Sequence, residues 1–143
     1  MDNFFNDGPG LVLGADSAAV NGKNLTDFTG LYAQDVHVYD AWEKLEYVGA
    51  GAWRAMAADW FGSLGTETVR VDFAGVRVLA GENMAMLSAV ATFTAFSADG
   101  RKLRSLTNRM TMGLELRDSR WLIVHEHSSL PVDIETGRGI FGA

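Results

Sequence analysis

A change in hydrophobic period near Thr66 constrains the fold of this chain more than any other feature. Before this point apolar residues recur at a spacing of three to four, which is typical of helices that bury one side. After it apolar and polar residues alternate, which is typical of strands. Helices followed by antiparallel strands with tight turns predict an α+β fold.

The first half of the sequence predicts three helices. The first is weak because it contains Gly14, the second is capped by Asn24 or Thr26, and the third has a broad apolar side. Their expected ranges are residues 11–20, 24–32 and 52–64. A turn at Gln34-Asp35 and a short strand over residues 36–42 are expected between the second and third helices. Residues 1–10 are expected to form a separate arm.

The second half predicts four long strands joined by hairpin turns, with Asp99-Gly100 as the strongest turn signal. The expected ranges are residues 67–79, 83–97, 103–116 and 121–129. The strand at 83–97 is apolar on both sides, so both sides need cover. The helices can cover only one face of such a sheet. The sequence therefore predicts a homodimer built through the other face.

Composition and charge restrict the class of protein. A chain of 143 residues without repeats or linkers is expected to form one domain, residues 1–143. The net charge of −6 and the lack of a Lys/Arg run argue against a nucleic acid or an anionic membrane as partner. No apolar run approaches the roughly 20 residues of a membrane span. The acidic N-terminus does not fit a signal peptide, so a cytoplasmic location is expected.

Asp40 is a lone acid in an otherwise apolar and aromatic segment, between Tyr39 and Trp42. A carboxylate in such surroundings costs free energy unless it is solvated, paired or used in chemistry. An apolar pocket would raise its pKa toward neutral pH, where it could accept and return a proton as a general base. The alternative is a solvated acid at a strand end that caps the turn at 43–46.

Two segments carry a family resemblance: LYAQDVHVYDAW, which starts at Leu31, and RWLIVHEHSSLP, which starts at Arg120. Together with the apolar helix between them, they resemble the NTF2-like superfamily, and within it the SnoaL-like and ketosteroid-isomerase-like proteins. The resemblance covers about residues 22–133. It implies a curved antiparallel sheet wrapped on the N-terminal helices into a cone, with a deep apolar pocket. The segment WLIVHEHSS is also similar to the association domain of calcium/calmodulin-dependent kinase II.

The resemblance also implies roles for individual residues. The isomerases carry their general base at the position of Asp40, eight residues after a tyrosine matched by Tyr32. Their two oxyanion donors fall near Ala15 and Met112, neither of which can donate a side-chain hydrogen bond. Asn108, or the indole N–H of Trp42, is expected to donate to the ligand instead.

The last strand presents two sets of side chains, because successive residues point to opposite faces. Strict alternation groups Trp121 and Ile123 with His125 and His127, and the other set contains Glu126 and Ser128. The resemblance places Glu126 and Ser128 in the pocket and the histidines on the dimer side. Glu126 would then be a second carboxylate facing Asp40. The alternative is a rim acid paired with Arg109 or Arg120.

A metal site built from His37, His125 and His127 is the competing interpretation of the histidines. Neither an HExxH motif nor a cysteine supports it, and histidines satisfied within an interface are commoner, so no metal is expected. No cofactor is expected either, because GxGxxG and GxxxxGK[ST] are absent.

These observations predict a protein that binds a small-to-medium apolar molecule bearing a carbonyl or hydroxyl, with proton transfer of the isomerase or lyase type as its chemistry. The alternative is a non-catalytic ligand-binding or oligomerisation module. Asp40 and Glu126 are the expected catalytic residues. The expected substrate-binding residues are Tyr32, Trp42, Trp60, Asn108, Met112 and Ser128.

Overall fold

The computed structural model describes residues 8–142. Of the arm expected at residues 1–10, residues 1–7 lie outside this range, and Gly8–Gly10 forms one 3₁₀ turn. Three helices and six strands follow in the order α1, α2, β1, β2, α3, β3, β4, β5, β6. Their bounds are Leu11–Asn21, Leu25–Thr29, Tyr32–Tyr39, Tyr47–Val48, Ala50–Leu64, Thr68–Ala80, Met84–Phe96, Lys102–Arg117 and Arg120–Ser129.

The second helix, α2, is shorter than its apolar spacing predicts. Its start is as expected, because the Asn24 side chain accepts a hydrogen bond from the Asp27 amide at 2.9 Å. It ends at Thr29, and the Gly30 amide closes the last turn on the Thr26 carbonyl. The prediction of helix to residue 32 was therefore wrong: Tyr32 begins β1, which also replaces the turn expected at Gln34-Asp35.

The third helix, α3, buries one side against the sheet, as its apolar pattern predicts. Trp53, Ala57, Phe61 and Leu64 are buried and recur along one side of the helix. The helix begins at Ala50, two residues before the expected start, directly after Gly49 with φ of 88°. Only a residue without a side chain adopts this backbone conformation readily.

The six strands form one sheet in the order β2-β1-β6-β5-β4-β3. The four long strands β3 to β6 pair antiparallel with their neighbours, as predicted. The exception is β1, which pairs parallel with β6, so the sheet is mixed. Sequence patterning does not reveal this pairing, because other strands and a helix separate β1 and β6 along the chain.

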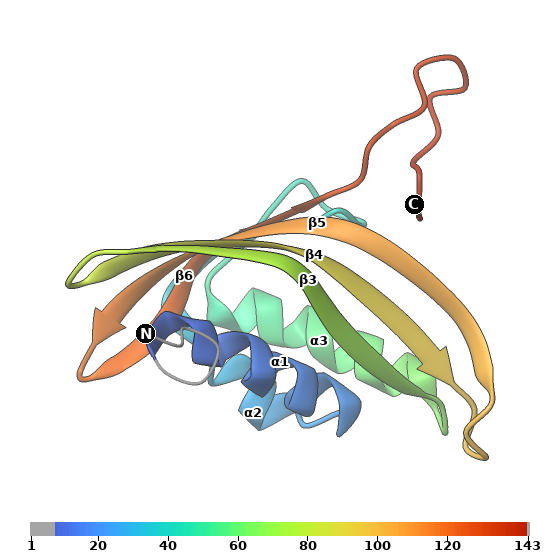
Figure 1. Cartoon of the computed structure of the whole chain (residues 1–143). Coiled ribbons are helices and arrows are strands. Elements are labelled where there is room, and N and C mark those ends of the chain that lie inside the picture. The colour runs from blue at the N-terminus through green and yellow to red at the C-terminus, as the bar shows by residue number, and fades with distance from the viewer. Residues whose placement is uncertain (1–7, 143) are drawn as a thin grey trace.

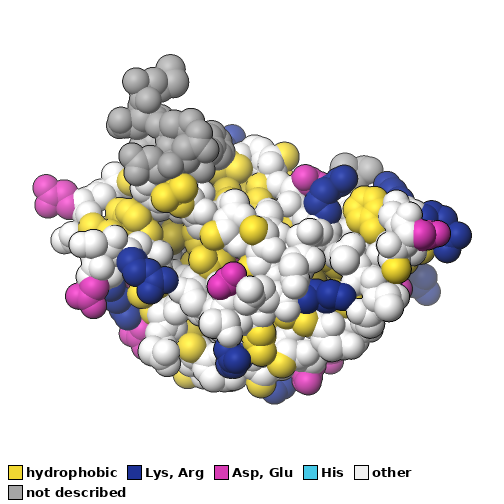
Figure 2. Space-filling model, turned by 90° about the horizontal axis from the view of Figure 1, so that it is seen from below, with side chains coloured by type: hydrophobic (Ala, Val, Ile, Leu, Met, Phe, Trp, Pro, Cys, Tyr) yellow, Lys and Arg dark blue, Asp and Glu magenta, His cyan; other side chains and the backbone are white. Residues whose placement is uncertain are grey.

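The sheet curves over the helices and leaves α1, α2 and α3 on its concave side (Figure 1). One cause of the bend is an irregular register between β3 and β4 at residues 74–77, where Gly75 has φ of 60°. From the helix side, Lys and Arg side chains lie singly among acidic and hydrophobic ones rather than in one patch (Figure 2). Within residues 8–142, none of the helices has the length and hydrophobicity to span a membrane.

A second irregularity, between β5 and β6, changes which side chains of β6 face inward. Gly113 pairs with His125 and Leu114 pairs with Ile123, so Val124 is left over between them. Strict alternation therefore fails at this point. Ile123 is fully buried and Trp121 packs against the core, on the same face as Glu126 and Ser128. The prediction that Trp121 and Ile123 share a face with the two histidines was wrong.

Candidate functional site

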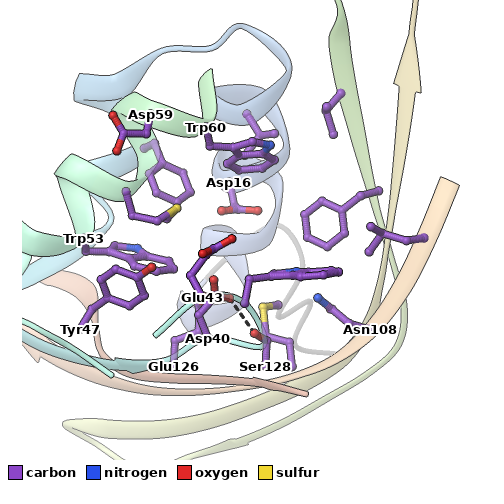
Figure 3. A pocket seen from close by; sticks show the side chains of 18 of the residues that line it. Asp16, Asp40, Glu43, Tyr47, Trp53, Asp59, Trp60, Asn108, Glu126 and Ser128 are labelled. Atoms are coloured by element: carbon purple, nitrogen blue, oxygen red, sulfur yellow. Dashed lines mark hydrogen bonds between the residues drawn. The ribbon is translucent and has the colours of Figure 1, made fainter. Parts of the chain in front are cut away.

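A cavity of about 770 Å³ lies between the concave face of the sheet and the helices. Its wall is largely aromatic and apolar, and a few polar side chains point into it (Figure 3). Of the expected site residues it brings together Tyr32, Asp40, Trp42, Trp60, Asn108, Glu126 and Ser128. The other aromatic residues in the wall are Phe28, Tyr47, Trp53, Phe73 and Phe93.

Asp40 follows directly after β1 and lies half-buried at the cavity wall. The Ser128 hydroxyl donates a hydrogen bond to its Oδ1 at 2.9 Å, and the Ala41 amide donates to the same hydroxyl oxygen at 3.0 Å. Burial raises the pKa of Asp40, while the bond from Ser128 opposes the rise. The carboxyl is thus oriented by β6 and has weakened solvation, as a general base requires.

Glu126 lies deeper, on the inner face of β6, with 7% of its surface exposed. The Tyr32 hydroxyl donates a hydrogen bond to its Oε1 at 2.8 Å. Burial, together with repulsion from Asp16, raises the pKa of Glu126 to about 8. The alternative of a rim acid paired with arginine does not hold, because Arg109 donates to Ser129 and Arg120 donates to the Gly30 carbonyl.

Tyr32 is buried between Glu126 and the aromatic rings of the core. Burial and the nearby carboxyl of Glu126 raise the pKa of its hydroxyl well above the usual range. The nearby indole N–H of Trp53 partly offsets this rise in pKa, although its geometry does not amount to a hydrogen bond within the described residues. The hydroxyl therefore stays protonated and acts as a donor to Glu126.

Asp16 is a cavity residue that sequence reasoning missed. It lies on α1 with 7% of its surface exposed, and burial raises its pKa to about 7. Its carboxyl group points into the cavity (Figure 3) and makes no hydrogen bond within residues 8–142. A signal was present in the sequence: Asp16 lies at helical spacing between Val12 and Val20, both of which are buried. Ala15, the position suggested by the family resemblance, is exposed instead.

Asn108 lies on the inner face of β5, next to Met110 in the cavity wall. Only 6% of its surface is exposed, and its Oδ1 atom has no hydrogen-bond partner within the described part of the chain. Its amide nitrogen points into the cavity (Figure 3). The Nδ2 atom also makes no hydrogen bond within residues 8–142. Buried side-chain amides normally have partners, so this N–H group is available to donate to a ligand.

The remaining expected ligand-binding residues differ in their placement. Trp60 is half-buried on α3 and packs edge-on against Phe93 across the cavity wall, with ring centroids 6.2 Å apart. Trp42 is 40% exposed and stacks on Phe141 at 5.4 Å. Met112 lies outside the cavity wall, because it is 1% exposed and packs within the hydrophobic core.

The histidines lie on the convex face of the sheet, away from the cavity. His37, Tyr39, His125 and His127 form one cluster of rings, with His37 and His125 stacked at 5.1 Å. None of the three histidines is among the residues that line the cavity. Within residues 8–142, no group of three or more His, Cys, Asp or Glu side chains is arranged to hold a metal ion.

Comparison with known proteins supports this fold. A family model described as a SnoaL-like domain matches residues 12–133. The crystal structure of an NTF2-like protein of unknown function from Pseudomonas putida KT2440 has a TM-score of 0.81, with 23% identity over 93% of this chain and 91% of that chain. Aln2 from a Streptomyces species has a TM-score of 0.72, with 17% identity over 86% of this chain and 92% of that chain.

A third solved structure is a candidate calcium/calmodulin-dependent protein kinase II association domain from Xanthomonas campestris. It has a TM-score of 0.66 and 26% identity, over 87% of this chain and 89% of that chain. No curated protein matches the chain. The expected NTF2-like fold is thus confirmed.

Proposed function

The chain belongs to the family of SnoaL-like domains, and we propose that it binds a small-to-medium apolar molecule with a carbonyl or hydroxyl group in its cavity. The observation that carries this proposal is an aromatic wall that also presents a carboxyl group, Asp40, and an amide group, Asn108. The volume of about 770 Å³ suits a ligand of drug-like size.

We further propose that Asp40 transfers a proton, in a reaction of the isomerase or lyase type. The Asp40 carboxylate would remove a proton from the carbon next to the ligand carbonyl and return it to a neighbouring atom. The Asn108 amide would donate a hydrogen bond to the oxygen on which negative charge develops. Ser128 holds the Asp40 carboxyl at 2.9 Å and is therefore a positioning residue.

This chemistry is tested by exchange of an α-proton for deuterium in a panel of cyclic ketones, followed by NMR. The substitution Asp40→Asn keeps the size of the side chain and removes the base. General-base catalysis typically contributes about 100-fold or more, so exchange in the variant should fall by at least that factor. Asp72→Asn is the matched control, because Asp72 is exposed and paired with Arg70 on β3. Equal exchange rates in the wild type and Asp40→Asn would contradict proton transfer by Asp40, and the protein would then be a binding protein without this chemistry.

The second candidate is a non-catalytic module that assembles through the convex face of the sheet. Two observations support it: the 26% identity to the candidate association domain, and the exposure of apolar side chains on β4. Met84, Met86 and Val90 are 64%, 49% and 41% exposed and alternate with buried residues, which places them on the convex face. We propose a homodimer through this face, which is compatible with either candidate function.

A further inference from the structure

We propose that the ligand carries a protonated amine, which the carboxyl groups of Asp16 and Glu126 hold at the buried end of the cavity. This inference rests on the proposed function, because it uses the same cavity and adds the charge of the ligand. It narrows the ligand class to apolar molecules with an ammonium group as well as an oxygen.

The cavity wall carries more acidic than basic side chains. The acidic residues in it are Asp16, Asp40, Glu43, Asp59 and Glu126, and the basic ones are Lys44 and Arg104. Arg104 pairs with Glu67 at 2.6 Å, and the Lys44 ammonium lies 5.5 Å from the centre of the Tyr47 ring. Within residues 8–142, no Lys, Arg or His side chain forms an ion pair with Asp16 or Glu126. A ligand cation would supply the missing charge.

Asp16 is buried and has no hydrogen-bond partner within residues 8–142. Glu126 on β6 and Tyr32 on β1 are close enough to interact electrostatically with it. Asp40 and Glu43, in the segment after β1, line the same cavity. The Tyr32 hydroxyl already donates to Glu126, so it leaves Asp16 without a hydrogen bond. A buried acid without a partner costs free energy. An ammonium group has three N–H donors, enough to serve both carboxyls, which lie close enough to repel each other.

Other side chains of the cavity also suit a ligand with an ammonium group and an oxygen. The Asn108 amide is 6% exposed, lines the cavity with its nitrogen toward it, and makes no hydrogen bond within the described residues (Figure 3). The cavity therefore has a second polar group that a ligand could satisfy. The buried end is also aromatic: the Phe28 and Tyr32 rings lie 5.3 Å apart, and the Tyr32 and Trp53 rings lie 5.8 Å apart. Aromatic faces attract cations, most strongly when water is excluded.

A ligand carboxylate would be repelled by this end of the cavity. A neutral ligand oxygen could bind only if an acid there kept its proton and donated it. The two possibilities differ in the sign of their pH dependence. An ammonium ligand selects the carboxylate forms, so its affinity rises with pH through the pKa values of about 7 and about 8. A neutral oxygen selects the protonated forms, so its affinity falls.

The test uses three probes that share one ring system: naphthylethylamine, naphthylethanol and naphthylacetate. Calorimetric titration into the full chain gives a Kd for each at about pH 6 and about pH 8, and the amine stays protonated at both. At the higher pH we expect the amine to bind about ten-fold or more tightly than the alcohol, because hydrogen bonds to charged groups are the stronger ones. The acetate should bind most weakly, and the preference for the amine should shrink at the lower pH.

Asp16→Asn should raise the Kd of the amine about ten-fold at the higher pH, and it should leave the Kd of the alcohol within about three-fold of the wild-type value. Glu126→Gln should act in the same direction, and it provides a second variant if the first does not fold. Asp72→Asn should leave all three affinities unchanged. Binding of the alcohol as tight as that of the amine, or an affinity that falls as pH rises, would overturn the amine proposal while the proposed function stands. Failure of all three probes to bind would contradict both.

Discussion

The three carboxyl groups of the cavity differ in how their charge is supported. Asp40 accepts a hydrogen bond from Ser128, Glu126 accepts one from Tyr32, and Asp16 accepts none within residues 8–142. Burial raises the pKa of all three, and repulsion between the carboxyls adds to the rise at Glu126. Neighbouring acids with different environments titrate over different pH ranges, which separates the groups that remain ionised from those that hold protons.

The stability of the wild type should decrease as pH rises from about 5 to about 8. In the unfolded chain these carboxyls lose their protons near pH 4, whereas in the folded chain the pKa values of Asp16 and Glu126 are about 7 and about 8. Over this range the folded state binds more protons than the unfolded state, so stability is lost as pH rises. Urea titrations at a series of pH values measure the trend.

Asp16→Asn should remove part of this pH dependence. The variant has no carboxyl to ionise at residue 16, so at about pH 8 it should exceed the wild type in stability by on the order of 2 kcal/mol. Asp72→Asn should change stability by no more than about 0.5 kcal/mol, because Asp72 is in an exposed ion pair. A wild type whose stability rises steadily from pH 5 to pH 8 would contradict the burial of Asp16 and Glu126 as acids.

Ser128→Ala should raise the pKa of Asp40. The Ser128 hydroxyl stabilises the carboxylate form at 2.9 Å, and the substitution removes that hydrogen bond. NMR titration of the Asp40 carboxyl carbon in the wild type and the variant measures the change. Ser129→Ala is the matched control, because the neighbouring hydroxyl accepts a hydrogen bond from Arg109 instead. An unchanged Asp40 pKa in Ser128→Ala would mean that Ser128 does not position the base.

At the scale of elements, the bend in β3 depends on backbone conformation at Gly75. Gly75 has φ of 60°, and no atom outside its neighbours lies within 4 Å of an added Cβ, so Gly75→Ala should cost about 1 kcal/mol through the backbone alone. Gly62 in α3 is equally open but does not have positive φ. Gly62→Ala should therefore stabilise the protein by about 0.5 to 1 kcal/mol. Thermal unfolding measures the stability of both variants. Equal changes in stability would contradict the dependence of the bend on the backbone conformation of Gly75.

The periodicity of the sequence predicts the long elements well because burial repeats many times along each of them. Each of the four long strands, β3 to β6, begins and ends within one residue of its expected bounds. Irregularities at a single residue are not predicted by this periodicity. The bulge at Val124 moves Trp121 and Ile123 to the inner face, and Tyr32 opens a strand although its spacing continues a helix.

The cavity was predicted in part. Asp40 was found because it is a lone acid in an aromatic segment, and Glu126 because the family register places its side of the strand in the pocket. Asp16 was overlooked because α1 is weakly patterned and the register points to Ala15. Met112 was expected in the wall because the family register places an oxyanion donor near it, but register along a strand fixes the face of a side chain and not its depth. It lies opposite Glu126 in the neighbouring strand and is covered by the core.

At the scale of the whole molecule, we predict a homodimer through the convex face. Val90→Glu introduces a charge at a position that is 41% exposed on this face. Burial of the carboxylate in a dimer would cost free energy that a monomer, with the carboxylate in water, avoids. Sedimentation velocity should show a dimer for the wild type and a monomer for the variant. Leu11→Glu is the control, because Leu11 is 52% exposed on α1 and the helices lie on the concave side. A wild type that stays monomeric at micromolar concentration would contradict the dimer.

We propose that a ligand binds in the concave cavity rather than on the convex face. The most direct test is titration of an apolar ketone, acetonaphthone, into isotopically labelled protein, with amide and side-chain chemical shifts followed by NMR. We predict that the largest chemical-shift changes occur at Asp40, Asn108 and Ser128 in the cavity wall, and that the signals of His125 and His127 on the convex face stay unchanged. Shifts concentrated at the two histidines, or no shifts at any concentration of the ketone, would contradict it.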